Sequence, residues 1–343
     1  MDAAPANPLM DPLTQGALGA ALPLATRHRK QAGLAAACGF LAGLAPDLDV
    51  LIRDPDDTLL FLEYHRQFTH ALIFIPVGSA LVAGAIYGLG RRWLSFGFMK
   101  VWLFCALGYA THGALDAATS YGTMLFWPFD ETRHALSIIS IVDPLFSLPV
   151  LALTVFGMIK NDGRWGRTAL VWALVYLSAG AYQHHAALAH ARALAESRGH
   201  APERITVKPT FGNIILWKSI YETAKQFHVD AIRPGPWPAT FSGTMVTKFD
   251  TTRDFPWLDP ASQQARDIER FRRFSQDFIA KALDGSARVI DVRYSFIPTE
   301  ISALWSIRLK PNAGPGSHAI YETDRTQARE QLPMLMKMIF AQP

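Results

Sequence analysis

The sequence predicts a mainly α protein, a polytopic bundle of about six membrane helices, two of them short, followed by a small soluble α+β domain. Only 28 of the 62 charged residues lie in the first 199 positions, where they leave long apolar stretches between short charged bursts. After residue 199 no stretch of that length occurs, and short alternating runs replace it. The mean hydropathy of +0.12 therefore averages two unlike parts, which we assign to residues 1–197 and 198–343.

Two short apolar segments rich in Gly and Ala, residues 13–26 and 31–45, begin the first part. Ala35, Gly39 and Gly43 recur at a spacing of four, and small residues at that spacing let helix backbones approach closely. We expect two short helices packed inside a bundle. Interfacial or re-entrant segments are the alternative, which would leave four or five spans.

Longer helices are predicted where charge is nearly absent, at residues 70–89, 98–120, 143–159 and 168–189. Apolar stretches of about 20 residues match the hydrocarbon thickness of a bilayer. A wholly soluble chain is thereby excluded. No basic segment precedes the first apolar stretch, so a cleaved signal peptide is not expected.

The basic residues of the predicted loops are distributed unevenly. Loops one, three and five contain Arg27, Arg29, Lys30, Arg91, Arg92, Lys100, Lys160, Arg164 and Arg167. Loops two and four contain only Arg53, Arg66 and Arg133 among many carboxylates. Because Lys and Arg are enriched in cytoplasmic loops, the odd loops are predicted to be cytoplasmic and the C-terminal domain periplasmic, in a multi-pass protein of a bacterial inner membrane.

The second part carries the pattern of a small α+β domain. Strands are predicted at residues 204–208, 213–217, 287–295 and 303–309, and helices at 261–283 and 326–340. Its Trp and Tyr residues are expected in the core or at an interface. Cys38 and Cys105 lie in apolar runs and are typical of small core residues, which excludes a disulfide scaffold. The basic residues form no single patch, so no nucleic-acid partner is expected.

The ionisable residues that interrupt the apolar pattern are the candidates for a functional site. They fall into three groups, Asp47 and Asp49, His65 and His70, and His112 and Asp116. Under the predicted topology all three groups lie at the same outer end of the bundle, although the topology was derived from Lys and Arg alone. Imidazole and carboxylate ligands suit zinc, with manganese or iron as alternatives, and six candidates are enough for one or two divalent metals.

Each of these residues also has a structural explanation. Asp47 and Asp49 fit a helix end or a turn, and a single histidine at a membrane boundary commonly forms an interfacial hydrogen bond. Asp116 is harder to explain in this way, because an isolated charge in the centre of an apolar helix costs about 2.5–3.5 kcal/mol on the insertion scale. A structural pair of His112 and Asp116 is the remaining alternative to a metal site.

The motifs PDLD, HRQFTHAL, HGALDAATSYGTMLFWPF and IVDPLFSLPVL, in this order between residues 10 and 150, resemble those of the inner-membrane-associated metal-dependent hydrolases, a family also labelled LexA-binding. The resemblance implies metal-binding roles for Asp47, Asp49, His65, His70, His112 and Asp116. It implies accompanying polar roles for Arg66, Thr69, Thr119, Tyr121, Gly122 and Asp143. One position departs from the family, since Gln15 follows Thr14 where a histidine is usual, so this residue either weakens one metal site or supports a ligand from behind.

We therefore expect an integral membrane hydrolase that activates water on one or two divalent metals, with Arg66 and Asp116 as catalytic residues. An arginine beside a metal favours an anionic phosphoester or lipid-linked substrate over a neutral amide. Arg133 is expected to be a loop residue. His184, His185 and His190 either join the site or, as we favour, lie at the membrane interface.

Two other classes of protein remain as alternatives. In the first, the bundle anchors a non-catalytic binding or regulatory domain and the metal is structural. In the second, a transporter, ionisable residues are expected near the membrane midplane rather than at one end. Membrane lipids are the expected surroundings, and no protein partner is assigned, because a periplasmic domain would not reach the cytoplasmic repressor named in the family label.

Overall fold

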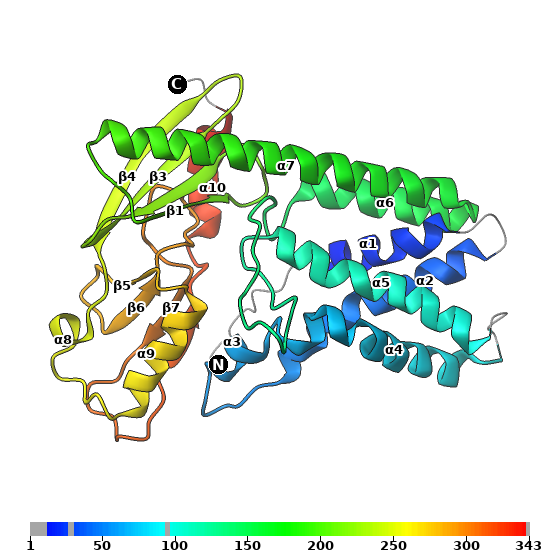
Figure 1. Ribbon diagram of the computed structural model, residues 1–343, viewed down its shortest axis with the longest axis horizontal. Helices are drawn as coiled ribbons and strands as arrows, with labels where there is room; N and C mark the ends of the chain where they lie inside the picture. The colour runs from blue at the N-terminus through cyan, green and yellow to red at the C-terminus, as the bar shows by residue number, and fades with distance from the viewer. Residues whose placement is uncertain (1–11, 27–30, 93–96, 341–343) are drawn as a thin grey trace.

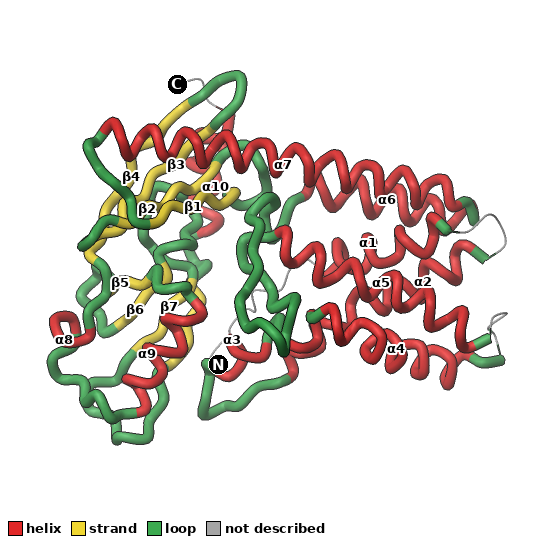
Figure 2. Tube along the Cα trace, viewed as in Figure 1, coloured by secondary structure: helices red, strands yellow, loops and turns green. Residues whose placement is uncertain are grey.

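The computed structural model describes residues 12–26, 31–92 and 97–340. A helical N-terminal region is joined to a C-terminal region that contains two antiparallel β-sheets (Figures 1 and 2). Helix α7 (Gly163–Ser197) extends along one side of the molecule from the helical region to the sheets (Figure 1). The predicted sixth helix is therefore longer than expected and continues to the end of the first part.

All six predicted helices of the N-terminal region are present. Besides α7 they are α1 (Pro12–Ala25), α2 (Ala32–Leu44), α4 (Ile75–Gly90), α5 (Phe98–Ala118) and α6 (Pro144–Lys160). The prediction that the third long helix begins at His70 is wrong, because residues 68–74 form the 3₁₀ turns η2 (Phe68–His70) and η3 (Leu72–Phe74). Helix α4 begins only at Ile75, with a proline in its first turn, where the missing N–H costs nothing.

Glycines bring three helices of the bundle into direct backbone contact. A β-carbon added at Gly39 of α2 would collide with the carbonyl oxygen of Gly19 on α1. One added at Gly108 of α5 would collide with the carbonyl oxygen of Gly39. The expected close packing of the small-residue stripe is confirmed at Gly39.

Length and hydropathy identify two candidate membrane spans among the described residues, Ala32–Leu51 and Leu72–Gly90. Helix α6 is apolar but shorter, with 17 residues. The predicted count of about six spans is therefore not confirmed, although the six helices are present. Arg27, Arg29 and Lys30, which contribute to the predicted orientation, lie outside the described residues.

Each sheet of the C-terminal region has four antiparallel strands in sequence order. The first contains β1 (Arg204–Pro209), β2 (Trp217–Glu222), β3 (Gln226–Arg233) and β4 (Ala239–Thr247). The second contains β5 (Ile279–Lys281), β6 (Arg288–Asp291), β7 (Trp305–Arg308) and β8 (Ile320–Thr323). Three helices accompany the sheets, α8 (Thr251–Asp254), α9 (Gln263–Phe274) and α10 (Ala328–Phe340).

Two boundaries differ from the predictions for local reasons. The strand predicted at 213–217 begins only at Trp217, because the Asn213 side chain accepts hydrogen bonds from the backbone N–H groups of Ile215 and Leu216 and holds a turn. The helix predicted at 261–283 ends at Phe274, and the positive φ angles of Gln276 and Asp277 turn the chain into β5.

The C-terminal region packs on the end of the helical region where the loops lie. Tyr121 shares a buried apolar cluster with Phe274 and Trp305. In β1, Lys208 donates a hydrogen bond from Nζ to the carbonyl oxygen of Ser120, and burial lowers the pKa of this lysine to about 7. The loop after α5 is therefore covered by the sheets.

Candidate metal centre

The structure brings all six predicted metal ligands together. Asp47 and Asp49 lie in the 3₁₀ helix η1 (Ala45–Leu51), which continues from α2. His65 ends the short helix α3 (Leu60–Tyr64), and His70 ends η2. The last two, His112 and Asp116, lie one turn apart on α5. All except Asp47 are buried, and the Asp47 side chain is 11% exposed.

The two histidines at the centre face each other through the same ring atom. The Nε2 atoms of His70 and His112 are 2.9 Å apart. His112 has its Nδ1 atom 2.6 Å from the carbonyl oxygen of Gly43, which can only accept, so Nδ1 carries a proton and, in the neutral ring, Nε2 offers a lone pair. His70 has its Nδ1 atom 3.3 Å from a carboxylate oxygen of Asp49. Two lone pairs this close require a cation or a proton between them.

Two carboxylates complete this group. Asp47 Oδ1 lies 3.5 Å from the Nε2 atom of His70 and 3.4 Å from that of His112. Asp116 Oδ2 lies 3.1 Å and 3.4 Å from the same two atoms. Neither carboxylate oxygen of Asp47 accepts a hydrogen bond, although both are buried. Because buried carboxylate oxygens are normally paired, the arrangement fits a bound cation.

A second group of candidate ligands adjoins the first and consists of Asp47, Asp49 and His65. Asp49 Oδ1 lies 2.8 Å from the Nδ1 atom of His65, and its Oδ2 accepts hydrogen bonds from the Arg66 N–H and the Thr69 hydroxyl. The Nε2 atom of His65 is buried without a hydrogen-bond partner. Burial lowers the pKa of His65, so its ring is neutral at pH 7. Because Asp49 also contacts the Nδ1 atom of His70, it fixes the orientation of the His65 and His70 imidazoles.

Arg66 is buried beside the centre. Its backbone is left-handed, with φ 62°, and its Nε lies 3.2 Å from Asp116 Oδ2. Nη1 donates to the Thr119 hydroxyl, whereas Nη2 has no hydrogen-bond partner. The guanidinium lies 4.7 Å from the centre of the Tyr121 ring. Its side chain is completely buried, so Arg66 does not extend to the lipid headgroups.

Gln15 of α1 contacts a proposed ligand directly. Its Nε2 donates a 2.8 Å hydrogen bond to Asp116 Oδ1. That bond leaves Asp116 Oδ2 to face the two histidines. Of the two sequence interpretations, the structure therefore favours the one in which Gln15 supports a ligand from behind.

The sequence interpretation of Arg133 as an ordinary loop residue misses its contacts. Its Nη2 donates to the backbone carbonyl oxygens of Leu62 and His65, at 2.7 and 2.9 Å. Its guanidinium also lies 5.6 Å from the centre of the Tyr121 ring. The sequence indicated a role for Arg133 only through its position as a single basic residue in a loop otherwise rich in aromatic and acidic residues. Nothing in the sequence indicated which backbone carbonyls it would reach.

Other candidates lie elsewhere. Asp143 caps α6 and accepts a hydrogen bond from the Tyr176 hydroxyl. His184 packs against Trp217, and His190 bonds the Thr240 hydroxyl, so both contact the first sheet rather than the metal centre.

A third acidic group, Asp57, Asp267 and His318, lies between the helical region and α9. Arg270 forms ion pairs with both of its carboxylates. The Arg270 guanidinium therefore already supplies the positive charge at this group.

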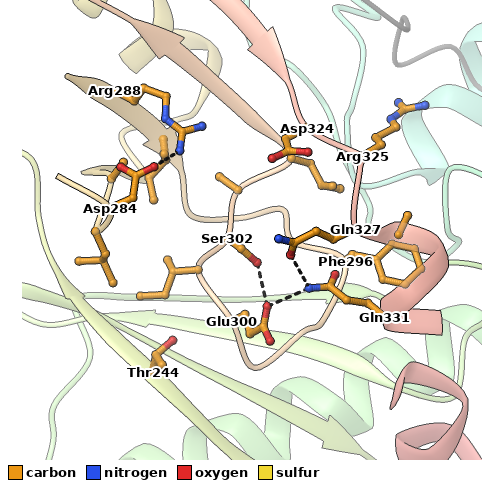
Figure 3. Close-up of a pocket in the computed structure, with 17 residues that line it drawn as sticks. Thr244, Asp284, Arg288, Phe296, Glu300, Ser302, Asp324, Arg325, Gln327 and Gln331 are labelled. Atoms are coloured by element: carbon orange, nitrogen blue, oxygen red, sulfur yellow. Dashed lines mark hydrogen bonds and ion pairs between the residues drawn. The ribbon is translucent and has the colours of Figure 1, made fainter. Parts of the chain in front are cut away.

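A cavity of about 540 Å³ in the C-terminal region lies apart from these groups (Figure 3). Several of its polar residues pair with one another, with Arg288 on Asp284 and with Glu300 accepting from Ser302 and Gln331. None of the six predicted ligands lines it. The metal centre is therefore the better candidate for the chemistry.

Comparison with known proteins agrees with a membrane protein. The profile of the family described as YdjM inner membrane protein matches residues 10–187, a range that contains all six predicted ligands. Inner membrane protein YbcI of Escherichia coli (strain K12) is 32% identical over 97 residues, or 28% of this chain and 54% of that protein. The chain thus matches about half the length of this curated relative. No solved structure matches significantly.

Proposed function

The chain belongs to the YdjM inner membrane protein family, and on this premise we propose that it is a metal-dependent hydrolase of phosphoester or lipid-linked substrates. The observation that carries the proposal is the 2.9 Å approach of two imidazole Nε2 atoms between the carboxylates of Asp47 and Asp116. Nitrogen and oxygen donors together favour zinc, with manganese or iron next. A divalent metal held here would lower the pKa of a bound water and polarise the substrate.

The protein side chains have separate roles in this proposal. His70, His112, Asp47 and Asp116 hold the metal, and His65 with Asp47 offers a second position. Asp49 keeps the Nε2 atoms of its two histidines directed inward, and Gln15 does the same for Asp116.

Arg66 binds the anionic oxygen of the substrate. Its Nη2 is the donor that has no hydrogen-bond partner in the described structure. Since Arg is suited to oxyanions with several acceptor oxygens, this group favours a phosphoester.

Removal of the metal tests the proposal. We expect the purified protein to contain zinc, manganese or iron and to hydrolyse a chromogenic phosphodiester in detergent. Chelation should abolish that activity, and adding back the same metal should restore it. Metal content is measured by mass spectrometry on the same samples. Bound metal without hydrolysis of phosphodiesters or lipid esters would instead support a structural metal in a regulatory protein.

We further propose that the C-terminal region is periplasmic, which the uneven distribution of loop Lys and Arg supports. The two native cysteines are buried, so a single cysteine at the exposed position Asn312 reports orientation without interference. Asn312→Cys should react with a membrane-impermeant maleimide once the outer membrane is permeabilised. A cysteine that reacts only after lysis of the inner membrane would place this region in the cytoplasm.

A further inference from the structure

A second cavity, of about 470 Å³, lies where the helical region meets α9. It is separate from the cavity of Figure 3 and shares no lining residue with it. One wall comes from the chain beside His65, with Leu62 and Gln67, and another from the segment that includes Met124 and Arg133. Helix α9 supplies the third wall. The cavity therefore adjoins the segment that carries His65.

Three arginines line this cavity, but only one of them is neutralised. Arg270 forms ion pairs with Asp57, Glu63 and Asp267. For Arg273, which is exposed, no ion pair occurs within the described part of the chain.

Arg133 contacts only uncharged groups through its hydrogen bonds. Its Nη2 is occupied by two backbone carbonyls, and its Nη1 is buried without a hydrogen-bond partner. A buried guanidinium with an unused donor is costly unless an anion accepts from it. Glu131, which also lines the cavity, is exposed to solvent. Arg133 and Arg273 thus both line the cavity without an ion pair among the described residues.

The segment that contains Arg133 also carries exposed aromatic residues, which lie outside the cavity lining. Phe126 is 48% exposed and Phe129 is 83% exposed. The same segment is tied to the start of a candidate membrane span, because the Leu72 N–H donates to the carbonyl oxygen of Leu125. Aromatic side chains collect where lipid headgroups meet the hydrocarbon. This places the cavity at headgroup level.

We propose that this cavity binds a phosphate group, supplied by the headgroup of an anionic phospholipid. Guanidinium groups pair with phosphate oxygens through strong charge-assisted hydrogen bonds. A soluble phosphate ester presents the same chemistry, so the experiment separates the two sources. The proposal does not depend on a bound metal, since none of the six predicted ligands lines the cavity.

The test uses the full-length protein in a neutral detergent and follows its thermal unfolding midpoint during titration. The probes are dioleoylphosphatidylglycerol, dioleoylphosphatidylcholine and glycerol 1-phosphate. Arg273→Gln removes an exposed cation from the cavity. The matched control is Arg272→Gln at the adjacent position, which pairs with Glu269 and Asp277 and does not line the cavity.

We expect phosphatidylglycerol to raise the midpoint and Arg273→Gln to raise its half-saturating concentration at least fivefold, with no change for Arg272→Gln. Stabilisation by phosphatidylglycerol alone assigns the site to a lipid, and equal stabilisation by glycerol 1-phosphate assigns it to a soluble phosphate. Equal responses to phosphatidylglycerol and phosphatidylcholine would overturn the proposal, as would equal responses of the two variants.

Discussion

His112→Ala should lower the metal affinity of the protein at least about 100-fold. Even partners behind a metal ligand contribute about 10- to 100-fold to affinity, so losing the ligand itself costs at least as much. The variant also removes the closest partner of the His70 Nε2 atom, 2.9 Å away. Metal content after gel filtration, with competition by a chelator of known affinity, measures the change. Hydrolysis should fall in parallel.

The matched control for this experiment is His190→Ala. His190 is also a histidine, but it lies on α7 and its ring bonds the Thr240 hydroxyl at 2.8 Å. It should keep the metal content and the activity of the wild type. The same metal affinity in His112→Ala and His190→Ala would remove His112 from the ligand set, provided that both variants elute as folded protein.

Gly39→Ala should strongly destabilise the helical region, although it adds only one methyl group. The added β-carbon would collide with the backbone of α1 at Gly19, which cannot move aside as a flexible side chain can. Overpacking typically costs about 1–3 kcal/mol, and a backbone obstruction lies at the upper end of that range. Thermal unfolding in detergent, followed by the loss of helical circular dichroism, measures the effect.

Gly84→Ala provides the comparison for the same chemical change. Gly84 lies on α4, and no atom lies within 4 Å of the β-carbon that alanine would add. Alanine favours a helix over glycine by about 1 kcal/mol, so this variant should be as stable as the wild type or more stable. If both variants lost stability equally, helix contact at Gly39 would not explain the effect.

The part of the site that could be predicted was the part encoded by spacing. His112 and Asp116 are four residues apart in a stretch otherwise nearly free of charge, so a shared helix face and a chemical role followed directly. The six candidate ligands lie together in the structure, in two adjoining groups. The resemblance to an inner-membrane family is confirmed by the family match.

The unpredicted part depends on contacts between distant segments. Asp49 contacts the Nδ1 atoms of two histidines, and Arg133 reaches the backbone of His65, 68 residues away. Such bonds leave no periodic pattern in the sequence. Strand β4 was missed for another reason, since it is largely exposed and its polar residues produce no apolar alternation.

The predicted ends of helices and strands were wrong where a local turn interrupts the hydrophobic spacing of the sequence. Phe278 continues the helical spacing of Phe271 and Phe274, yet it lies beyond the turn at Gln276 and packs in another apolar cluster. The apolar pattern predicted which residues would be buried, but it did not indicate which element would carry them.

Helix α7 joins the helical region to the sheets and also sets the distance between them. Its 35 residues, at about 1.5 Å each, span about 52 Å, which exceeds a hydrocarbon core of about 30 Å by about 20 Å. An uninterrupted helix of that length fixes the distance between the sheets and the far end of the helical region. In the periplasmic orientation proposed above, the metal centre would lie at the outer end of the helical region, where a lipid-linked substrate could present its headgroup without leaving the bilayer.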